Sequence, residues 1–249
     1  MPKQYMRFIS WNVYLDDFES ADDAFSSKRV TRVRKSLENL KDSQYRFEQL
    51  ELTDDLLDQF VVLYDAFMTK KEGGVVYPVK EGINANQEKG RKYHMLALWN
   101  GEVLEGGLIF SERKSAISVA YRVFPTSLDI ATTASPAQIA EYMVVDAALK
   151  MGKARVNHGR DRNAYGINAD IGLASFKMRS GAIPHISKNG NEIVDLPETL
   201  DSDILVCVGD EPGEICDELV LFTDLDEEEA LKKYQISKYK GVPLRVKKR

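Results

Sequence analysis

The chain has 249 residues, of which 43% are hydrophobic and 29% charged, a composition typical of a soluble globular protein with one large or two small domains. No segment approaches the roughly 18 to 20 apolar residues of a membrane span, and the N-terminus lacks a signal-peptide pattern, so we expect a cytoplasmic protein without membrane contact. Two cysteines, Cys207 and Cys216, and three scattered histidines disfavour a disulfide framework and a metal site. We expect both cysteines to be buried thiols, with a bridge possible if they lie on adjacent strands.

Charge is distributed unevenly along the chain, although the net charge is −5. Residues 28–41 carry six cations against one acid, Glu38, and residues 232–249 carry no acid. Such segments could contact a phosphate-rich partner such as tRNA. The alternative is a solvated helix face and a frayed C-terminal tail.

The first predicted elements alternate between helix and strand. Ser26 and Ser27 precede a helix over 28–40, whose apolar residues recur every three or four positions. Residues 45–52 alternate like a strand, and Thr53-Asp54 opens a helix with an apolar face through Phe67. The polar segment 68–92 is predicted to be a mobile connection or an acceptor-side loop.

A hairpin follows, with strands at 94–99 and 102–110 and a turn at Asn100-Gly101. Residues 115–124 form a third strand. After a loop over 125–136, residues 137–152 form a helix and 153–159 return as a strand. This order predicts an α+β fold whose central sheet is antiparallel at first and closes with a parallel crossover.

The pattern weakens after Pro184. Residues 203–208 and 218–223 resemble strands, and 224–235 resemble a short helix with acids first and lysines last. We therefore predict a first domain over 1–189 and a C-terminal extension over 190–249 that packs against it and ends in the basic tail 232–249.

Three motifs resemble the FemAB-like branch of the GNAT acyltransferase superfamily, which includes polysaccharide-associated acetyltransferases and peptidyl transferases. They are SSKRVTRVRKSLENL near the start, ALKMGKARVNHGR, and GLASFKMRSGAIP with its Phe-Lys pair and turn glycine. The likeness covers about residues 25–187. It implies a GNAT-like fold with helices flanking the sheet. It also implies amide formation from an acyl-CoA or aminoacyl-tRNA donor and an amine acceptor, either a small molecule or a peptide.

Two departures from this pattern affect the expected site. Asn157-His158-Gly159 stands where the family shows Asp-Phe-Gly, so an acid is lost and an imidazole is gained. The segment 130–136, IATTASP, has none of the glycines with which mainstream GNAT enzymes approach the pyrophosphate of CoA. The absence of these glycines is common in the FemAB-like branch.

The candidate catalytic residues are Tyr121, His158 and Lys177. Tyr121 lies in the strand that borders the reacting carbonyl in GNAT folds, although a half-buried tyrosine is more often core. His158 is a candidate because an unperturbed imidazole is suited to proton transfer near neutrality, although a strand-end histidine is more often structural. Lys177 matches the family lysine that holds negative charge on the donor or intermediate, and an exposed, merely solvated lysine is the alternative.

The candidate donor- or substrate-binding residues surround these three. By strand alternation, Arg122 should face the side opposite Tyr121. Arg160 and Arg162 could clamp a phosphate or carboxylate, or could instead pair with Asp161 and other acids. The full set is Arg122, Thr132, Thr133, Ser135, Arg160, Arg162 and Phe176.

The sequence leaves two functional hypotheses. One is an acyltransferase or aminoacyltransferase that makes an amide by direct attack, because no nucleophile-histidine arrangement is visible. The other is a GNAT-shaped protein that has lost catalysis and recognises an anionic ligand, a nucleic acid or a protein partner.

Overall fold

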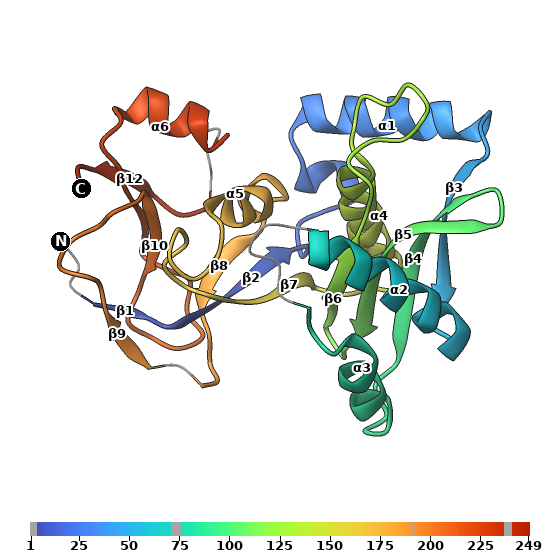
Figure 1. The fold of residues 1–249 in the computed structure, drawn as a ribbon, viewed down its shortest axis with the longest axis horizontal. Helices are drawn as coiled ribbons and strands as arrows, with labels where there is room; N and C mark the ends of the chain where they lie inside the picture. The colour runs from blue at the N-terminus through green and yellow to red at the C-terminus, as the bar shows by residue number, and fades with distance from the viewer. Residues whose placement is uncertain (1–3, 71–75, 191, 237–240) are drawn as a thin grey trace. The chain divides into compact units, whose positions relative to one another are not determined.

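A computed structural model describes residues 4–70, 76–190, 192–236 and 241–249 (Figure 1). The chain divides into two compact units. Leu15–Val156 form the continuous unit, and Met1–Tyr14 with Asn157–Arg249 form the discontinuous unit. The domain boundary expected at residue 189 stays a prediction, because these units are defined by compactness alone.

The continuous unit contains four strands paired in an antiparallel sheet of order β3-β4-β5-β6. They are β3 (Tyr45–Glu51), β4 (Tyr93–Asn100), β5 (Val103–Glu112) and β6 (Ala116–Val123). The hairpin turn at Asn100-Gly101 is confirmed: Asn100 pairs with Val103, and Gly101 adopts a positive φ of 56°.

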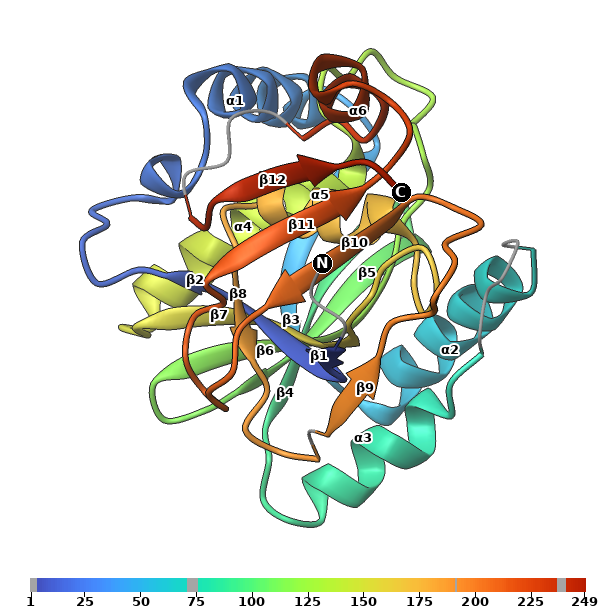
Figure 2. The same cartoon turned by 90° about the vertical axis from the view of Figure 1, so that its left-hand side faces the viewer.

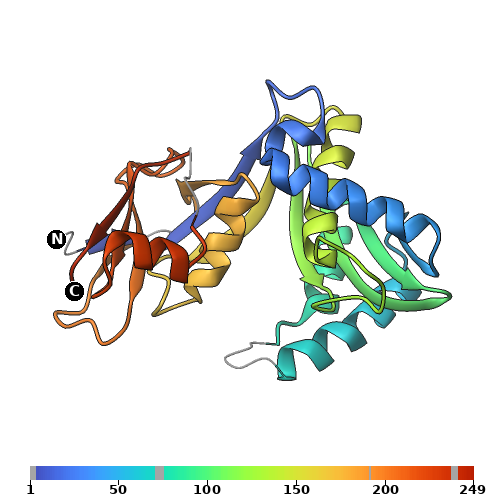
Figure 3. The same ribbon diagram turned by 90° about the horizontal axis from the view of Figure 1, so that it is seen from above.

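Helices cover both faces of this sheet (Figure 3). They are η1 (Ala21–Ala24), α1 (Ser27–Lys41), α2 (Asp54–Lys70), α3 (Val79–Gln87) and α4 (Pro136–Lys150). The prediction of a mere connection over 68–92 was wrong for the part that α3 occupies. Val79 and Ile83, four positions apart, bury the apolar side of this short helix. Residues 71–75 of that segment lie outside the described residues.

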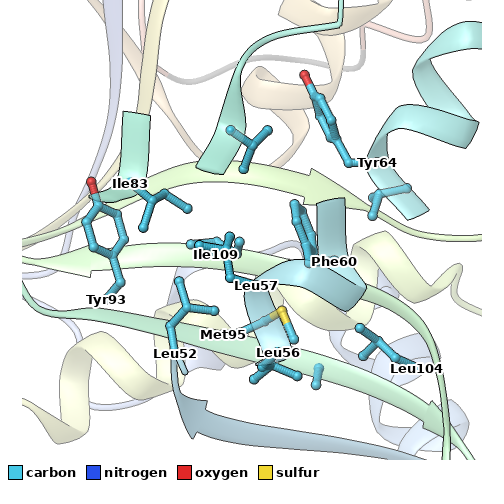
Figure 4. Close-up of a cluster of buried hydrophobic side chains, with 13 residues drawn as sticks. Leu52, Leu56, Leu57, Phe60, Tyr64, Ile83, Tyr93, Met95, Leu104 and Ile109 are labelled. Carbon is cyan, nitrogen blue, oxygen red and sulfur yellow. The ribbon is translucent and has the colours of Figure 1, made fainter. Parts of the chain in front are cut away.

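The apolar face of α2 packs on the sheet and on α3 (Figure 4). Its core members include Leu57, Phe60 and Tyr64, which meet Met95 of β4 and Ile109 of β5. Phe60 and Ile109 are completely buried. The three-and-four spacing read from the sequence is therefore the face that fixes α2 on the sheet.

The discontinuous unit is built from short strands with two helices (Figure 2). The elements are β1 (Gln4–Met6), β2 (Phe8–Tyr14), α5 (Ile171–Arg179), β8 (Ile183–Ile186), β9 (Ile193–Asp195), β10 (Ile204–Val208), β11 (Glu218–Phe222), α6 (Glu227–Lys233) and β12 (Leu244–Lys247). β7 (Arg155–Arg162) also belongs to this unit from Asn157 onward. β2 pairs antiparallel with β8, β1 with β9, and β10 with β11. β12 adds to β11 in parallel.

Residues of the extension connect to the earlier part of this unit through strand pairing and side chains. The Asn163 side chain donates to the Cys207 carbonyl at 2.7 Å and accepts from the Cys207 amide at 2.9 Å. Tyr165 forms a β-bridge with Leu205. Both cysteines are free and buried. The mixed α+β class with a mainly antiparallel sheet and flanking helices is confirmed.

The basic tail is ordered where the structure describes it, so the alternative of a frayed end was wrong. The chain from Glu192 to Glu229 carries acids and no lysine or arginine. The tail's cations pair with these acids: Lys233 with Asp203 at 2.9 Å, Arg245 with Glu218 at 3.0 Å, and Arg249 with Asp224. These contacts give the tail an internal electrostatic partner, which competes with any phosphate-rich one. Residues 237–240 of the tail lie outside the described residues.

Candidate active site

The end of β7 carries the first group of predicted site residues, all in the discontinuous unit. Gly159 has a φ of +85°, a conformation that favours glycine, and its amide donates to the Asn157 side chain at 2.9 Å. Asn157 in turn donates to Asn12 of β2 at 2.9 Å. His158 is only 5% exposed. Asn157 therefore links β7 to β2, and the His158 imidazole is buried.

Lys177 lies inside the discontinuous unit and not on an exposed helix face. Its ammonium nitrogen donates to both carboxylate oxygens of Asp161, at 2.8 and 2.7 Å. The side chains of Lys177 and Asp161 are 4% and 13% exposed. Tyr165 donates to the same carboxylate at 2.6 Å and accepts from the Trp11 indole at 2.8 Å. A buried chain of four side chains therefore joins β2, β7 and α5.

This network affects the chemistry of Tyr165. Burial, and then the negative charge of Asp161, raise the pKa of Tyr165 well above its ordinary value. Because the hydroxyl remains protonated, it can donate to the carboxylate over the whole physiological pH range.

Arg160 and Arg162 lie in β7, immediately before and after Asp161 in the sequence. Both are exposed, and by strand alternation they share a face that Asp161 does not. The Arg160 guanidinium lies 4.5 Å from the centroid of the Phe8 ring and donates to the Asn189 carbonyl at 3.1 Å. The sequence offered two roles for these arginines, binding an anion or pairing with Asp161. Among the described residues, the ion-pair partner of Asp161 is Lys177 and not an arginine.

The Phe-Lys motif occupies α5 as expected, followed by a turn at Gly181, where φ is +79°. Phe176 is half-buried. Lys177 belongs to the buried stripe of the helix together with Ile171, Ala174 and Met178. That stripe is the signal that could have revealed a buried lysine from the sequence.

Tyr121 and Arg122, in the continuous unit, face opposite sides of their sheet, as strand alternation predicted. The Tyr121 ring meets the Tyr64 ring edge-on at 5.8 Å, and Gly82 leaves space beside its hydroxyl. Burial, followed by the nearby tyrosines, raises the pKa of Tyr121, which opposes a role as a base near neutral pH. Arg122 donates to the buried Glu141 of α4 at 2.6 Å.

The loop before α4 is held by α1. The buried Ser36 hydroxyl oxygen accepts from the amides of Thr133 at 3.0 Å and Ala134 at 2.9 Å. The Thr133 hydroxyl donates to the Arg32 carbonyl at 2.9 Å. Ser135 caps α4 in a capping box: its amide donates to Gln138, and its side chain accepts from the Gln138 amide. The amides of Thr133, Ala134, Ser135 and Gln138, at the helix start where a pyrophosphate would bind, are therefore engaged within the protein.

The basic segment 28–41 is also partly engaged. Arg32 donates to the Thr133 carbonyl, Arg34 pairs with Asp22 at 2.5 Å, and Lys41 pairs with Glu38 at 2.9 Å. Lys28 and Lys35 remain exposed on the helix. These contacts reduce the cationic surface that α1 offers to a polyanion.

The predicted site residues thus form two sets. The discontinuous unit holds His158, Arg160, Arg162, Phe176 and Lys177, and the continuous unit holds Tyr121, Arg122, Thr132, Thr133 and Ser135. The sequence suggested Asp161 only as a partner of the two arginines, and it did not point to Tyr165, Trp11 or Ser36. The bonds Asp161–Lys177, Trp11–Tyr165 and Ser36–Thr133 span 16, 154 and 97 positions, so no local pattern could have revealed them. The Tyr165–Asp161 bond spans four positions.

Within residues 4–70, 76–190, 192–236 and 241–249, no three His, Cys, Asp or Glu side chains gather into a group that could hold a metal ion. None of the helices described is both long and apolar enough to cross a bilayer.

No protein-family model matches the sequence, and no curated protein matches it. Among solved structures, the chain is similar to the crystal structure of FemX, with a TM-score of 0.51 and 12% identity, over 71% of this chain and 59% of FemX. The chain therefore corresponds to less than two thirds of the length of FemX. A looser likeness, TM-score 0.47 and 12% identity over 76% of this chain and 60% of the other, is to L-PGS from Bacillus licheniformis. The similarity to FemX confirms the GNAT-like fold that the sequence predicted.

Proposed function

We propose that this protein is an aminoacyltransferase. An acceptor amine attacks the ester carbonyl of an aminoacyl-tRNA, an amide forms, the ester C–O bond breaks, and the tRNA hydroxyl leaves with a proton. The FemAB-like motifs and the fold shared with FemX support transfer to an amine. No covalent enzyme intermediate is part of the proposal, because direct attack requires only a neutral amine, a proton acceptor and stabilisation of the developing oxyanion.

One observation favours tRNA over CoA as the donor. The Ser36 hydroxyl oxygen accepts hydrogen bonds from the amides of Thr133 and Ala134, and the Gln138 side-chain oxygen accepts one from the amide of Ser135. A CoA pyrophosphate bound at the start of α4 would have to replace these three bonds, two of which involve the completely buried Ser36 hydroxyl. The donor-binding role of Thr132, Thr133 and Ser135 therefore stays a prediction. The hydrogen bonds that Ser36 and Gln138 make to this loop weigh against it.

The experiment is a direct comparison of donors. The protein is incubated with aminoacyl-tRNA or acyl-CoA and a panel of small amines and amine-bearing peptides, and amide products are measured by mass spectrometry. We expect an amide from the tRNA donor. A product formed from acyl-CoA alone would reverse the choice of donor.

A second candidate, a binding protein without catalysis, is favoured by one observation. Two of the three residues predicted to be catalytic, His158 and Lys177, are buried, and Lys177 is ion-paired. Such a protein would be stabilised by tRNA in a thermal-shift measurement while yielding no amide from either donor.

A further inference from the structure

The resemblance assigns to the lysine of the Phe-Lys pair the role of holding negative charge on the donor or intermediate. In this chain, that ammonium is buried and bonded to both oxygens of Asp161. Removing it from this carboxylate to reach a ligand would leave a largely buried charge uncompensated, which is costly.

Arg160, in contrast, is exposed and already oriented. Its guanidinium stacks near the Phe8 ring at 4.5 Å, and one of its terminal nitrogens is held by the Asn189 carbonyl. These two contacts fix the plane of the fork, while the bond to Asn189 uses only Nη1. The other N–H groups of a guanidinium can then meet two oxygens of one phosphate. Orientation before binding lowers the entropy that a long side chain loses on binding.

The local charge also favours an anion. Arg162 is exposed on the same side of β7, two residues along. Across the residues that the structure describes, no ion pair joins Arg160 or Arg162 to a carboxylate. Arg7 also lies 5.3 Å from the Phe8 ring, although Glu192 pairs with it.

Asp161 is the acid nearest to these arginines in the sequence, and Lys177 keeps it on the other side of the strand. Tyr165 and Trp11 extend the same chain of hydrogen bonds. If Lys177 were absent, the negative charge of Asp161 would no longer be compensated. It would then lower the positive electrostatic potential around Arg160 and Arg162. The lysine therefore acts on the arginines through Asp161.

We propose that Arg160, with Arg162, binds a phosphate group of the donor, and that Lys177 and Asp161 are positioning residues beneath this site. The identity of the donor rests on the proposed function, but the phosphate site does not. Phosphate chemistry of this kind could come from the acceptor end of tRNA or from CoA, and binding measurements with the two probes separate these sources.

The test measures binding of uncharged tRNA and of CoA to the full chain and to single variants. Arg160→Ala should weaken binding of one probe by about tenfold or more, the loss expected for a charge-assisted hydrogen bond, without lowering the melting temperature. Arg160→Lys should recover only part of the affinity, because an ammonium lacks the planar fork. Arg113→Ala, which removes an exposed arginine from the continuous unit, is the matched control and should leave binding unchanged.

The role of Lys177 is decided by a double variant. Lys177→Met combined with Asp161→Asn removes both charges of the pair, so the protein should fold and bind the probe within about threefold of the wild type, since replacing a whole buried pair is often nearly neutral. A double variant that is folded but binds as weakly as Arg160→Ala would show that Lys177 contacts the ligand and would overturn the proposal. So would unchanged binding of both probes by Arg160→Ala, or no binding of either probe by the wild type. None of these results depends on amide formation, so failure of the proposed reaction would be seen separately.

Discussion

Replacing Lys177 with methionine should destabilise the discontinuous unit by about 3 kcal/mol. The substitution leaves the Asp161 carboxylate, 13% exposed, without its ion-pair partner. Removing one member of a buried ion pair typically costs about 3 to 5 kcal/mol. We place the effect at the lower end, about 3 kcal/mol, because the Tyr165 hydroxyl would still donate to the carboxylate.

The assay uses the two tryptophans, which report on different units. Trp11 is completely buried in the network of Lys177, and Trp99 lies in the continuous unit. In a Trp99→Phe background, urea unfolding followed by fluorescence therefore reports on the discontinuous unit alone. Lys232→Met, at an exposed position of α6, is the control and should change stability by no more than about 0.5 kcal/mol.

A double-mutant cycle makes the test decisive. Lys177→Met with Asp161→Asn should be within about 1 kcal/mol of the wild type, although each single substitution is strongly destabilising. If Lys177→Met costs less than about 1 kcal/mol, or if the effects of the two substitutions simply add, the buried ion pair is not what fixes α5 to β7, and the reasoning fails.

Three further predictions concern single hydrogen-bonded groups. Burial and Asp161 raise the pKa of Tyr165 in the folded state, so the contribution of this hydroxyl to stability is complete below about pH 10 and is lost as the pH rises from its unfolded-state pKa towards its folded-state pKa. In urea unfolding above pH 10, the stability of Tyr165→Phe should therefore decrease less steeply with pH than that of the wild type, and equal slopes would refute this. Ser36→Ala leaves the Thr133 and Ala134 amides without their acceptor and should destabilise the continuous unit by about 2 kcal/mol, measured from Trp99 fluorescence in a Trp11→Phe background; a change below about 0.5 kcal/mol would mean that the loop is not held by α1. Burial opposes ionisation of Asp203, but hydrogen bonds from Tyr234 and Lys233 outweigh this effect and lower the pKa of the carboxyl. The carboxylate therefore stabilises the fold above its unfolded-state pKa, and this contribution is lost as the pH falls through its folded-state pKa. In Asp203→Asn, the free energy of unfolding should fall less steeply with decreasing pH than in the wild type, and an unchanged pH dependence would contradict this.

Much of the fold follows from short-range patterns. The stripe of α1, the Asn100-Gly101 hairpin and the helix predicted over 137–152 are each encoded within a few residues, and each appears in the structure. The failures have a common cause. α3 has only nine residues, and its stability depends on packing against α2. β12 forms because β11 offers a free edge, which the tail sequence cannot reveal.

The site was less predictable because its contacts are long-range. The sequence brought Asp161 and Lys177 to attention separately, but only the fold joins them. Similarly, the sequence presents Thr133 as a free hydroxyl, but in the fold this hydroxyl donates to the Arg32 carbonyl, 101 positions away. The local sequence feature that pointed to a buried Lys177 was its position in the apolar stripe of α5. This position outweighs the general tendency of lysine side chains to be exposed.

The most direct test of the account is the mass of the product formed by the wild-type protein from an isotopically labelled aminoacyl-tRNA and an amine-bearing acceptor. The account predicts an acceptor heavier by one labelled aminoacyl residue, with release of uncharged tRNA, and no such product from the matching acyl-CoA. Labelled product from acyl-CoA and none from aminoacyl-tRNA, or no product from either donor with folded protein, would contradict it.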